Sequence, residues 1–186
     1  MCADQISRHE KRFPLQKGAH LVLQLGNITH WSGDVTINAS NMRMLGGGGV
    51  DGAVHAAAGP ELLAACRRLP TVRRGARCPT GEARGVGRSY QNSSPITEGY
   101  RLPVRHVIHM AGPVYGDQTP EESERLLSSA YRSCLELASA EGMATTAFPA
   151  ISCGMYGFPL ADAAKVAVQT CMDAAGSLRE ALGIGA

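Results

Sequence analysis

The chain has 186 residues, of which 44% are hydrophobic and 18% charged, and its formal net charge is +2. These values are typical of a single globular domain and give no general reason to expect nucleic acid or a membrane as a partner. No apolar stretch approaches the roughly 18 residues of a membrane-spanning helix, and the N-terminal segment is too polar for a signal peptide, so we expect an intracellular monomer, cytoplasmic or nuclear.

The six cysteines show no Cys-x-x-Cys pair and no regular spacing; they are Cys2, Cys66, Cys78, Cys134, Cys153 and Cys171. This pattern indicates neither a disulfide framework nor a zinc site. Cys134 and Cys171 lie in apolar stripes with helical spacing, which favours core packing. No cluster of histidines, cysteines and acids has the spacing of metal ligands, so we expect no metal and no cofactor.

The first elements lead to a glycine-rich loop. We expect residues 1–18 to form a polar tail and residues 21–25 a buried strand that ends at Gly26. A short β-branched strand over residues 35–37 is followed by Asn-Ala-Ser-Asn at residues 38–41 and by four glycines at residues 46–49. A helix is predicted over residues 50–58.

This glycine loop has the features of a phosphate site. Glycines let the main chain approach an anion closely, and the helix that follows adds free N–H groups and the positive end of its dipole. Asn41 precedes the glycines and Asp51 follows them. Each residue alone fits a structural role, in a turn or in the first turn of a helix. At the two ends of one loop, they favour chemistry on a group attached to the phosphate.

The remaining elements alternate between strand and helix. Pro60 starts a second helix after Gly59, and Thr119, with a glutamate three residues later, caps a long helix that ends at Gly142. Strands are predicted over residues 104–110 and 144–152, a second glycine-containing loop over residues 153–158, and a helix over residues 160–175 that Gly176 closes. The alternation predicts an α/β fold whose ligand site lies at the carboxyl ends of parallel strands.

Residues 71–99 differ from the rest of the chain because arginines are scattered among Gly, Ser, Pro and Thr. We interpret this stretch as an exposed basic excursion. It is either a solvated loop or a contact surface for nucleic acid or a modified protein. A nucleic-acid-binding module would rest on these arginines alone and would show steep salt dependence, so we do not expect nucleic acid as a partner.

Several motifs together resemble the macrodomain family, and most closely its MacroD-type branch. In the family's order they are Gly26-Asn27-Ile28-Thr29, the segment from Asn38 to Gly59, Cys66-Arg67, Thr80-Gly81-Glu82-Ala83, Tyr100 to Pro103, Val107-Ile108-His109 with Gly112-Pro113, and Phe148 to Pro159. The resemblance implies a three-layer α/β/α sandwich with a mixed, mainly parallel sheet over residues 19–186. It also implies that Arg84 to Gly99 is an insertion and that the family's last strand is missing.

The resemblance further implies that ADP-ribose and ADP-ribosylated proteins are the partners. The chain would remove mono-ADP-ribose from acidic side chains, deacetylate O-acetyl-ADP-ribose, or do both; the alternative is a non-catalytic ADP-ribose reader. Asn41 would orient the distal ribose, and Asp51 would position or activate a water. The other implied ligand contacts are Asn27, Ile28, Asn38, Gly48, Gly49, Val50, Ser152, Cys153, Gly154, Met155 and Tyr156. Asn27 stands where the family commonly has an acid that contacts adenine.

Other interpretations of these residues are weaker. Gly47-x-Gly49-x-x-Gly52 satisfies a dinucleotide fingerprint, yet no acid lies between Glu61 and Glu82, where a ribose-binding acid belongs. A P-loop would need a lysine after the glycines. Ser152 and Cys153 have no histidine placed by the sequence to activate them. His55, His106 and His109 are interpreted as packing or surface residues.

Overall fold

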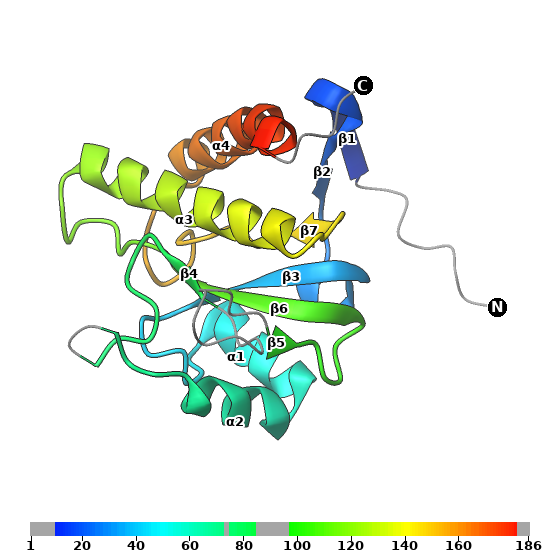
Figure 1. Cartoon of the computed structure of the whole chain (residues 1–186). Coiled ribbons are helices and arrows are strands. Elements are labelled where there is room, and N and C mark those ends of the chain that lie inside the picture. Colours follow the sequence, from blue (N-terminus) through cyan, green and yellow to red (C-terminus); the bar gives the residue numbers. More distant parts are fainter. Residues whose placement is uncertain (1–9, 73–74, 85–96, 182–186) are drawn as a thin grey trace.

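The computed structural model describes residues 10–72, 75–84 and 97–181 (Figure 1). In chain order, the elements are β1 (Glu10–Pro14), η1 (Gln16–Gly18), β2 (His20–Gln24), η2 (Ile28–His30), β3 (Gly33–Ser40), α1 (Gly49–Ala58), α2 (Pro60–Arg68), β4 (Ala83–Arg84), β5 (Thr97–Glu98), β6 (Val104–Ala111), α3 (Pro120–Ala140), β7 (Thr146–Ala147) and α4 (Leu160–Ala181). Within the described residues, no helix has both the length and the apolar character that crossing a membrane requires.

The central sheet has the strand order β4-β6-β3-β7, and β5 also pairs with β6. Strand β3 is parallel to both β6 and β7, whereas β4 and β5 are antiparallel to β6. This arrangement confirms the predicted mixed sheet with parallel strands at its centre. Its register pairs Asn38 with His109 and Ser40 with Ala111, so the ends of β3 and β6 reach the same edge.

Helices cover both faces of this sheet, with α3 and α4 on one face and α1 and α2 on the other (Figure 1). Alternate residues of β3 divide between the faces because successive side chains in a strand point in opposite directions. Val35 and Ile37 belong to the larger core cluster, which also contains residues of α3 and α4. Val54 and Leu62, from α1 and α2, pack in a second cluster with Val107 of β6. The three-layer sandwich is thereby confirmed.

Helix starts follow the predicted capping signals. Pro60 occupies the first turn of α2, and the Thr119 side chain accepts a hydrogen bond from the Glu122 N–H at the start of α3. The predicted end of α4 is wrong, because the helix continues through Gly176 to Ala181. One glycine in a helix interior costs only about 1 kcal/mol relative to alanine, so it does not by itself end a helix that good helix formers flank.

The N-terminal predictions need two corrections. Strand β1 and the turn η1 lie within the predicted tail, of which residues 1–9 fall outside the described residues. Strand β2 forms where a buried strand was expected, but it is mostly exposed, with Leu25 just beyond it 78% exposed. Among the described residues it pairs with β1, in a two-stranded sheet separate from the central sheet, rather than with β3 or β7.

Two other predicted segments also change. The strand expected over residues 144–152 is limited to β7, because the chain bends away from the sheet before Pro149, which has no N–H to donate to a neighbouring strand. Both ends of the predicted insertion, in β4 and β5, pair with β6. Its residues 85–96 lie outside the described residues, as do residues 182–186 at the C-terminus.

Asp34 ties the start of β3 to the start of β7. Its Oδ2 accepts hydrogen bonds from the Ala144 N–H at 2.9 Å, the Thr145 N–H at 3.0 Å and the Thr145 hydroxyl at 3.1 Å. These bonds lower the pKa of the Asp34 carboxyl, the one from Ala144 most strongly. The carboxylate therefore stabilises the fold above its unfolded-state pKa, and this stabilisation is lost as the pH falls through its lowered folded-state pKa.

We expect Asp34→Asn to melt at a lower temperature than the parent at neutral pH, because the neutral amide cannot replace a carboxylate that accepts three hydrogen bonds. The difference should narrow as the pH falls towards about 3, where the parent loses the same charge. Thermal melts of both proteins across this range check the prediction. Glu124→Gln, at an exposed position of α3, is the control. A difference that stays constant with pH would contradict it.

Candidate functional site

The first glycine loop connects β3 to α1. It leaves the sheet after Ser40, at the carboxyl end of β3, and its last glycine is the first residue of the helix. Gly46 has φ +82° and Gly49 has φ +61°, conformations that side chains with a Cβ rarely adopt. The first N–H groups of α1 have no partner within the helix, and Gly48 and Gly49 are exposed there, with Val50 half-buried. The loop therefore presents N–H donors to solvent, as an anion site requires.

The second glycine loop follows β7 and faces the first. A Cβ built on Gly48 would lie 3.4 Å from the Met155 Cε, so the two loops meet across one opening. Ser152 has φ +61°, an uncommon conformation for a residue other than glycine, and Met155 is 80% exposed. Two backbone hydrogen bonds hold the loop in shape, from the Phe158 N–H to the Ser152 carbonyl and from the Gly157 N–H to the Gly154 carbonyl.

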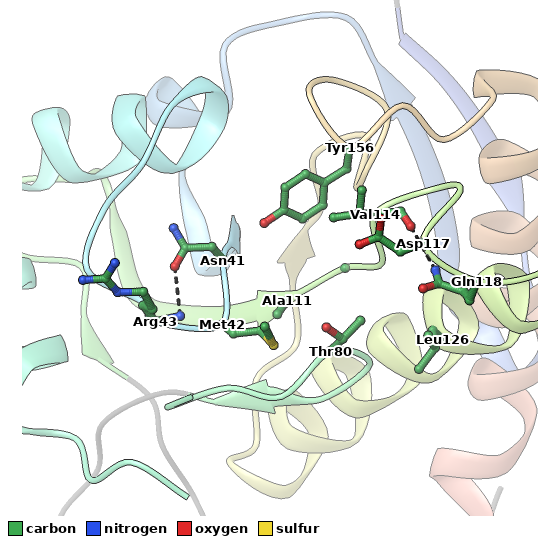
Figure 2. A pocket seen from close by; sticks show the side chains of 11 residues that line it. Asn41, Met42, Arg43, Thr80, Ala111, Val114, Asp117, Gln118, Leu126 and Tyr156 are labelled. Atoms are coloured by element: carbon green, nitrogen blue, oxygen red, sulfur yellow. Dashed lines mark hydrogen bonds between the residues drawn. The ribbon is translucent and has the colours of Figure 1, made fainter. Parts of the chain in front are cut away.

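A cavity of about 270 Å³ opens at the ends of β3 and β6, between the start of the first glycine loop, Tyr156 of the second loop and the segment that leads from β6 into α3 (Figure 2). Tyr156 extends from the second loop with its hydroxyl directed towards the side of the cavity where Asn41 lies. The lining residues are Asn41, Met42, Arg43, Thr80, Ala111, Gly112, Val114, Asp117, Gln118, Leu126 and Tyr156. Asn41, which is predicted to orient the distal ribose, and Tyr156, a predicted ligand contact, therefore border the same cavity.

Asn41 and Asp51 converge on Gly47. A Cβ built on Gly47 would lie 3.1 Å from the Asp51 Oδ2 and 3.3 Å from the Asn41 Nδ2. The Asn41 Oδ1 accepts a hydrogen bond from the Arg43 N–H at 2.9 Å, and its Nδ2 donates a longer one, 3.4 Å, to the Gly46 carbonyl. The amide side chain is thus fixed by its own loop. The Asn41 amide and the Asp51 carboxylate, ten residues apart in the sequence, therefore both lie next to the exposed Gly47.

Asp51 is only 3% exposed, although it lies in the first turn of a helix. Burial raises the pKa of its carboxyl, and the hydrogen bond from Asn38 and the charge of His55 oppose this rise. Its Oδ2 has no hydrogen-bond partner among the described residues. Burial also raises the pKa of the Tyr156 hydroxyl, with a further contribution from the charge of Asp51. A carboxylate with a raised pKa and a free oxygen suits proton transfer.

Asn38 lies behind Asp51, and its side chain is completely buried. A contact between Asn38 and the ligand stays a prediction. The Asn38 Nδ2 donates a hydrogen bond of 2.7 Å to the Asp51 Oδ1 and lies 3.1 Å from the Nδ1 of His109. Burial lowers the pKa of His109 to about 3, so its imidazole is neutral and its Nδ1 accepts from the Asn38 amide.

His55 is the site residue that sequence reasoning missed. It lies one helical turn after Asp51, and its Nε2 is 3.4 Å from the Asp51 Oδ1. The two atoms are not aligned for a hydrogen bond, and both ring nitrogens lack a partner within the described part of the chain. Burial lowers the pKa of His55, while the charge of Asp51 opposes this shift. The i,i+4 spacing from an acid was the available signal.

Ser152 and Cys153 show no arrangement for nucleophilic catalysis. The Ser152 Oγ is buried without a hydrogen-bond partner among the described residues, and the Cys153 thiol donates to the Ile151 carbonyl. Burial raises the pKa of Cys153, which disfavours the reactive thiolate. Gly154 is exposed, and a Cβ there would meet no atom within 4 Å. The loop is open at the position predicted to contact phosphate.

Asn27 and Ile28 lie apart from this cavity and line neither it nor the second cavity described below. The Asn27 Oδ1 accepts hydrogen bonds from the Thr29 N–H at 3.0 Å and the Thr29 hydroxyl at 2.8 Å. Asn27 thereby caps the short helix η2, and Ile28 is half-buried in its first turn. A contact between these residues and adenine stays a prediction.

Comparison with known proteins agrees with this geometry. The Macro domain family model matches residues 37–167. A macro domain-containing protein of Xanthomonas campestris is 49% identical over 148 residues, which cover 80% of this chain and 76% of that protein. The O-acetyl-ADP-ribose deacetylase of Escherichia fergusonii is 49% identical over 152 residues, covering 82% of this chain and 77% of that protein.

Solved structures show the same fold. The Oceanobacillus iheyensis macrodomain with ADP superposes with a TM-score of 0.78 at 40% identity, over 92% of this chain and 82% of that one. The Trypanosoma brucei macrodomain in complex with ADP-ribose superposes with a TM-score of 0.66 at 36% identity, over 82% of this chain and 57% of that one. With both glycine loops in place and most of its length matched, the chain belongs to the macrodomain family.

Proposed function

We propose that this chain binds ADP-ribose between its two glycine loops and hydrolyses esters of it, releasing mono-ADP-ribose from acidic side chains, acetate from O-acetyl-ADP-ribose, or both. The observation that carries the proposal is the convergence of the Asn41 amide and the Asp51 carboxylate on Gly47. The names of the relatives support it, since one is an O-acetyl-ADP-ribose deacetylase and two structural neighbours hold ADP or ADP-ribose.

The diphosphate would lie between the loops. Exposed backbone at Gly48 and Gly49 offers N–H donors at the positive end of the α1 dipole, and the exposed Gly154 allows close approach from the other side. The distal ribose would then lie in the cavity between Asn41 and Tyr156. There the amide hydrogen-bonds ribose hydroxyls, and the aromatic ring covers the sugar.

Asp51 would act on a water beside this ribose. In the ester of an acidic side chain, water adds to the ribose C1″, the bond from C1″ to the carboxyl oxygen breaks, and the acceptor leaves as a carboxylate. In O-acetyl-ADP-ribose, water adds to the acetyl carbonyl, the bond from the carbonyl carbon to the ribose oxygen breaks, and acetate is released. In the first reaction the Asp51 Oδ2 takes a proton from the water and later returns it to solvent; in the second it passes this proton to the departing ribose oxygen, and the acetic acid formed loses its own proton to solvent.

The experiment that tests this function is incubation of the protein with a mono-ADP-ribosylated Glu/Asp acceptor and, separately, with O-acetyl-ADP-ribose. We expect loss of the ADP-ribosyl label in the first reaction or release of acetate in the second. Calorimetry with free ADP-ribose measures binding independently. Binding without turnover of either substrate would support the reader alternative, and absence of binding would refute the site itself.

Gly154→Glu should abolish ADP-ribose binding. A side chain at this position meets no atom within 4 Å, so the variant should fold, and its carboxylate would then repel the diphosphate that we place there. Calorimetric titration of the parent and the variant with ADP-ribose checks the prediction. Gly154→Gln, with the same size and no charge, separates repulsion from bulk. Unchanged affinity in Gly154→Glu would show that the diphosphate does not lie between the two loops.

A further inference from the structure

Buried polar atoms without partners gather behind Asp51. Among the described residues, six buried side-chain nitrogen and oxygen atoms lack a hydrogen-bond partner, and four of them are the Asn38 Oδ1, the Asp51 Oδ2 and the two ring nitrogens of His55. Buried polar groups are nearly always paired, so a cluster of unpaired ones indicates that a further group satisfies them. The positions of the neighbouring residues show what kind of group would fit.

Two soft metal ligands border this cluster. The Cys66 Sγ lies 3.6 Å from the His109 Nε2. Around a tetrahedral zinc ion, a sulfur at about 2.3 Å and a nitrogen at about 2.1 Å are separated by roughly the same distance. One ligand atom each of His55, Cys66 and His109 lies within 4.8 Å of the other two. The spacing in the sequence did not indicate this group, because α1, α2 and β6 bring together residues that are distant in the sequence.

We propose that His55, Cys66 and His109 bind a thiophilic divalent cation of the Zn²⁺ class and that Asp51 supplies the fourth ligand. The Asp51 Oδ1 lies 3.4 Å from the His55 Nε2, a separation that two ligands of one ion can have. The donor set of two imidazoles, one thiolate and one carboxylate is typical of zinc rather than of magnesium or calcium, which prefer oxygen ligands.

The hydrogen bonds around the cluster can rearrange for such an ion. His109 would bind through its Nε2 and carry its proton on Nδ1, which faces Asn38. Rotation of the Asn38 amide by half a turn directs its unpaired Oδ1 to accept that proton. This Oδ1 would then replace the Nδ2 that now lies 2.7 Å from the Asp51 Oδ1, so the Asp51 carboxylate would have to turn away from Asn38 and towards the ion. Burial raises the pKa of the Cys66 thiol to about 12, so its proton would leave only as the ion binds, and it would pass out along the way by which the ion enters.

A second cavity, which measures about 410 Å³, lies beside the first glycine loop and reaches one of the proposed ligands, His55. Its lining includes Leu45, Gly46, His55, Gly59 and Leu63. His55 thus stands between this cavity and the buried Cys66 and His109, with its side chain 11% exposed. Rotation of this one side chain would admit an ion without unfolding the core.

A cation in this position would inhibit hydrolysis, because it would hold the Asp51 carboxylate away from the water that we assign to it. This consequence rests on the proposed function, whereas the metal site does not. We therefore test the two with different measurements.

The test of the site uses Co²⁺, titrated into the metal-free protein with a phosphine reductant. We expect saturation at one equivalent, a thiolate-to-cobalt charge-transfer band with the visible bands of tetrahedral cobalt, and displacement of Co²⁺ by Zn²⁺. Cys66→Ala should remove the charge-transfer band. His55→Ala, at a half-buried position, should still fold and should weaken Co²⁺ binding more than about 100-fold, since loss of an outer-shell partner alone costs about 10- to 100-fold.

Matched controls are Cys171→Ala and His106→Ala, which remove a thiol and an imidazole outside the cluster and should leave the spectrum unchanged. Absence of the thiolate band in the parent, or its persistence in Cys66→Ala, would overturn the metal site. So would unchanged Co²⁺ affinity in His55→Ala. In the hydrolysis assay, Zn²⁺ should inhibit the parent and much less His55→Ala; equal inhibition of both would refute the link to Asp51. The cobalt titration tests the metal site even if the protein has no hydrolase activity.

Discussion

Asp51→Asn should slow hydrolysis of the ADP-ribosyl ester by roughly 10²- to 10⁴-fold, the usual contribution of a general base. Asparagine has the shape of aspartate and still accepts the hydrogen bond that the Asn38 amide donates to position 51. The amide cannot take a proton from water. ADP-ribose binding should therefore persist, because the diphosphate contacts that we propose come from the two glycine loops.

The stability of Asp51→Asn separates catalysis from a structural role of the acid. Burial raises the folded-state pKa of Asp51, so the protonated form is favoured by folding, and this contribution is lost as the pH rises through that pKa. At neutral pH the parent carries a buried charge at a cost to stability. We expect Asp51→Asn to melt at or slightly above the temperature of the parent at neutral pH, and this advantage should shrink in acid.

The raised pKa also sets the pH dependence of the parent. Hydrolysis requires ionised Asp51 in the proposed mechanism, so its rate should fall on the acid side with an apparent pKa above the ordinary value for an aspartate. Single-turnover hydrolysis, ADP-ribose calorimetry and thermal melts across pH together check these expectations. Asp162→Asn is the control, since Asp162 also lies in the first turn of a helix. Parent-like hydrolysis by Asp51→Asn would show that another group activates the water.

Asn41→Ala is the second variant with a large expected effect. Loss of one hydrogen bond to the reacting ribose should cost roughly 1 to 3 kcal/mol of transition-state stabilisation, or about ten- to a hundredfold in rate. Stability should change little, since within the described part of the chain the Asn41 side chain forms hydrogen bonds with Arg43 and Gly46 of its own loop. A loss near 1 kcal/mol would lower the melting temperature by about 2 to 4 °C in a domain of this size.

Comparison of kcat with KM decides what Asn41 does. If the amide orients the ribose in the transition state, kcat falls and ADP-ribose affinity changes less. Gln169→Ala, at an exposed position of α4, is the control for loss of a side-chain amide. Full activity in a folded Asn41→Ala protein would count against the proposed role and in favour of a site built for binding alone.

Local signals in the sequence were sufficient for much of the fold. Pro60 and Thr119 correctly predicted helix starts, because each acts within a single helical turn. A proline at the first helical position has no N–H that needs a partner, and the side chain of a capping threonine accepts a hydrogen bond from an N–H of the first turn. Signals of this kind failed at Gly176, where the helix continues, and at β2, where Val22 and Leu23 are exposed. Burial of a strand depends on which layers cover it, and no residue within the strand specifies them.

The glycine loop with Asn41 and Asp51 at its ends could be predicted from the residues alone, because ten residues of chain containing four glycines hold both side chains near one point. The surroundings behind Asp51 could not be predicted in this way. The parallel register of β3 and β6 places Asn38 beside His109, 71 residues later, and α2 adds Cys66. Such contacts follow from strand pairing and helix packing across the whole domain, which local spacing does not encode. The ionisation of the site acid is set by this buried surrounding, so its chemistry depends on the fold as much as on the motif.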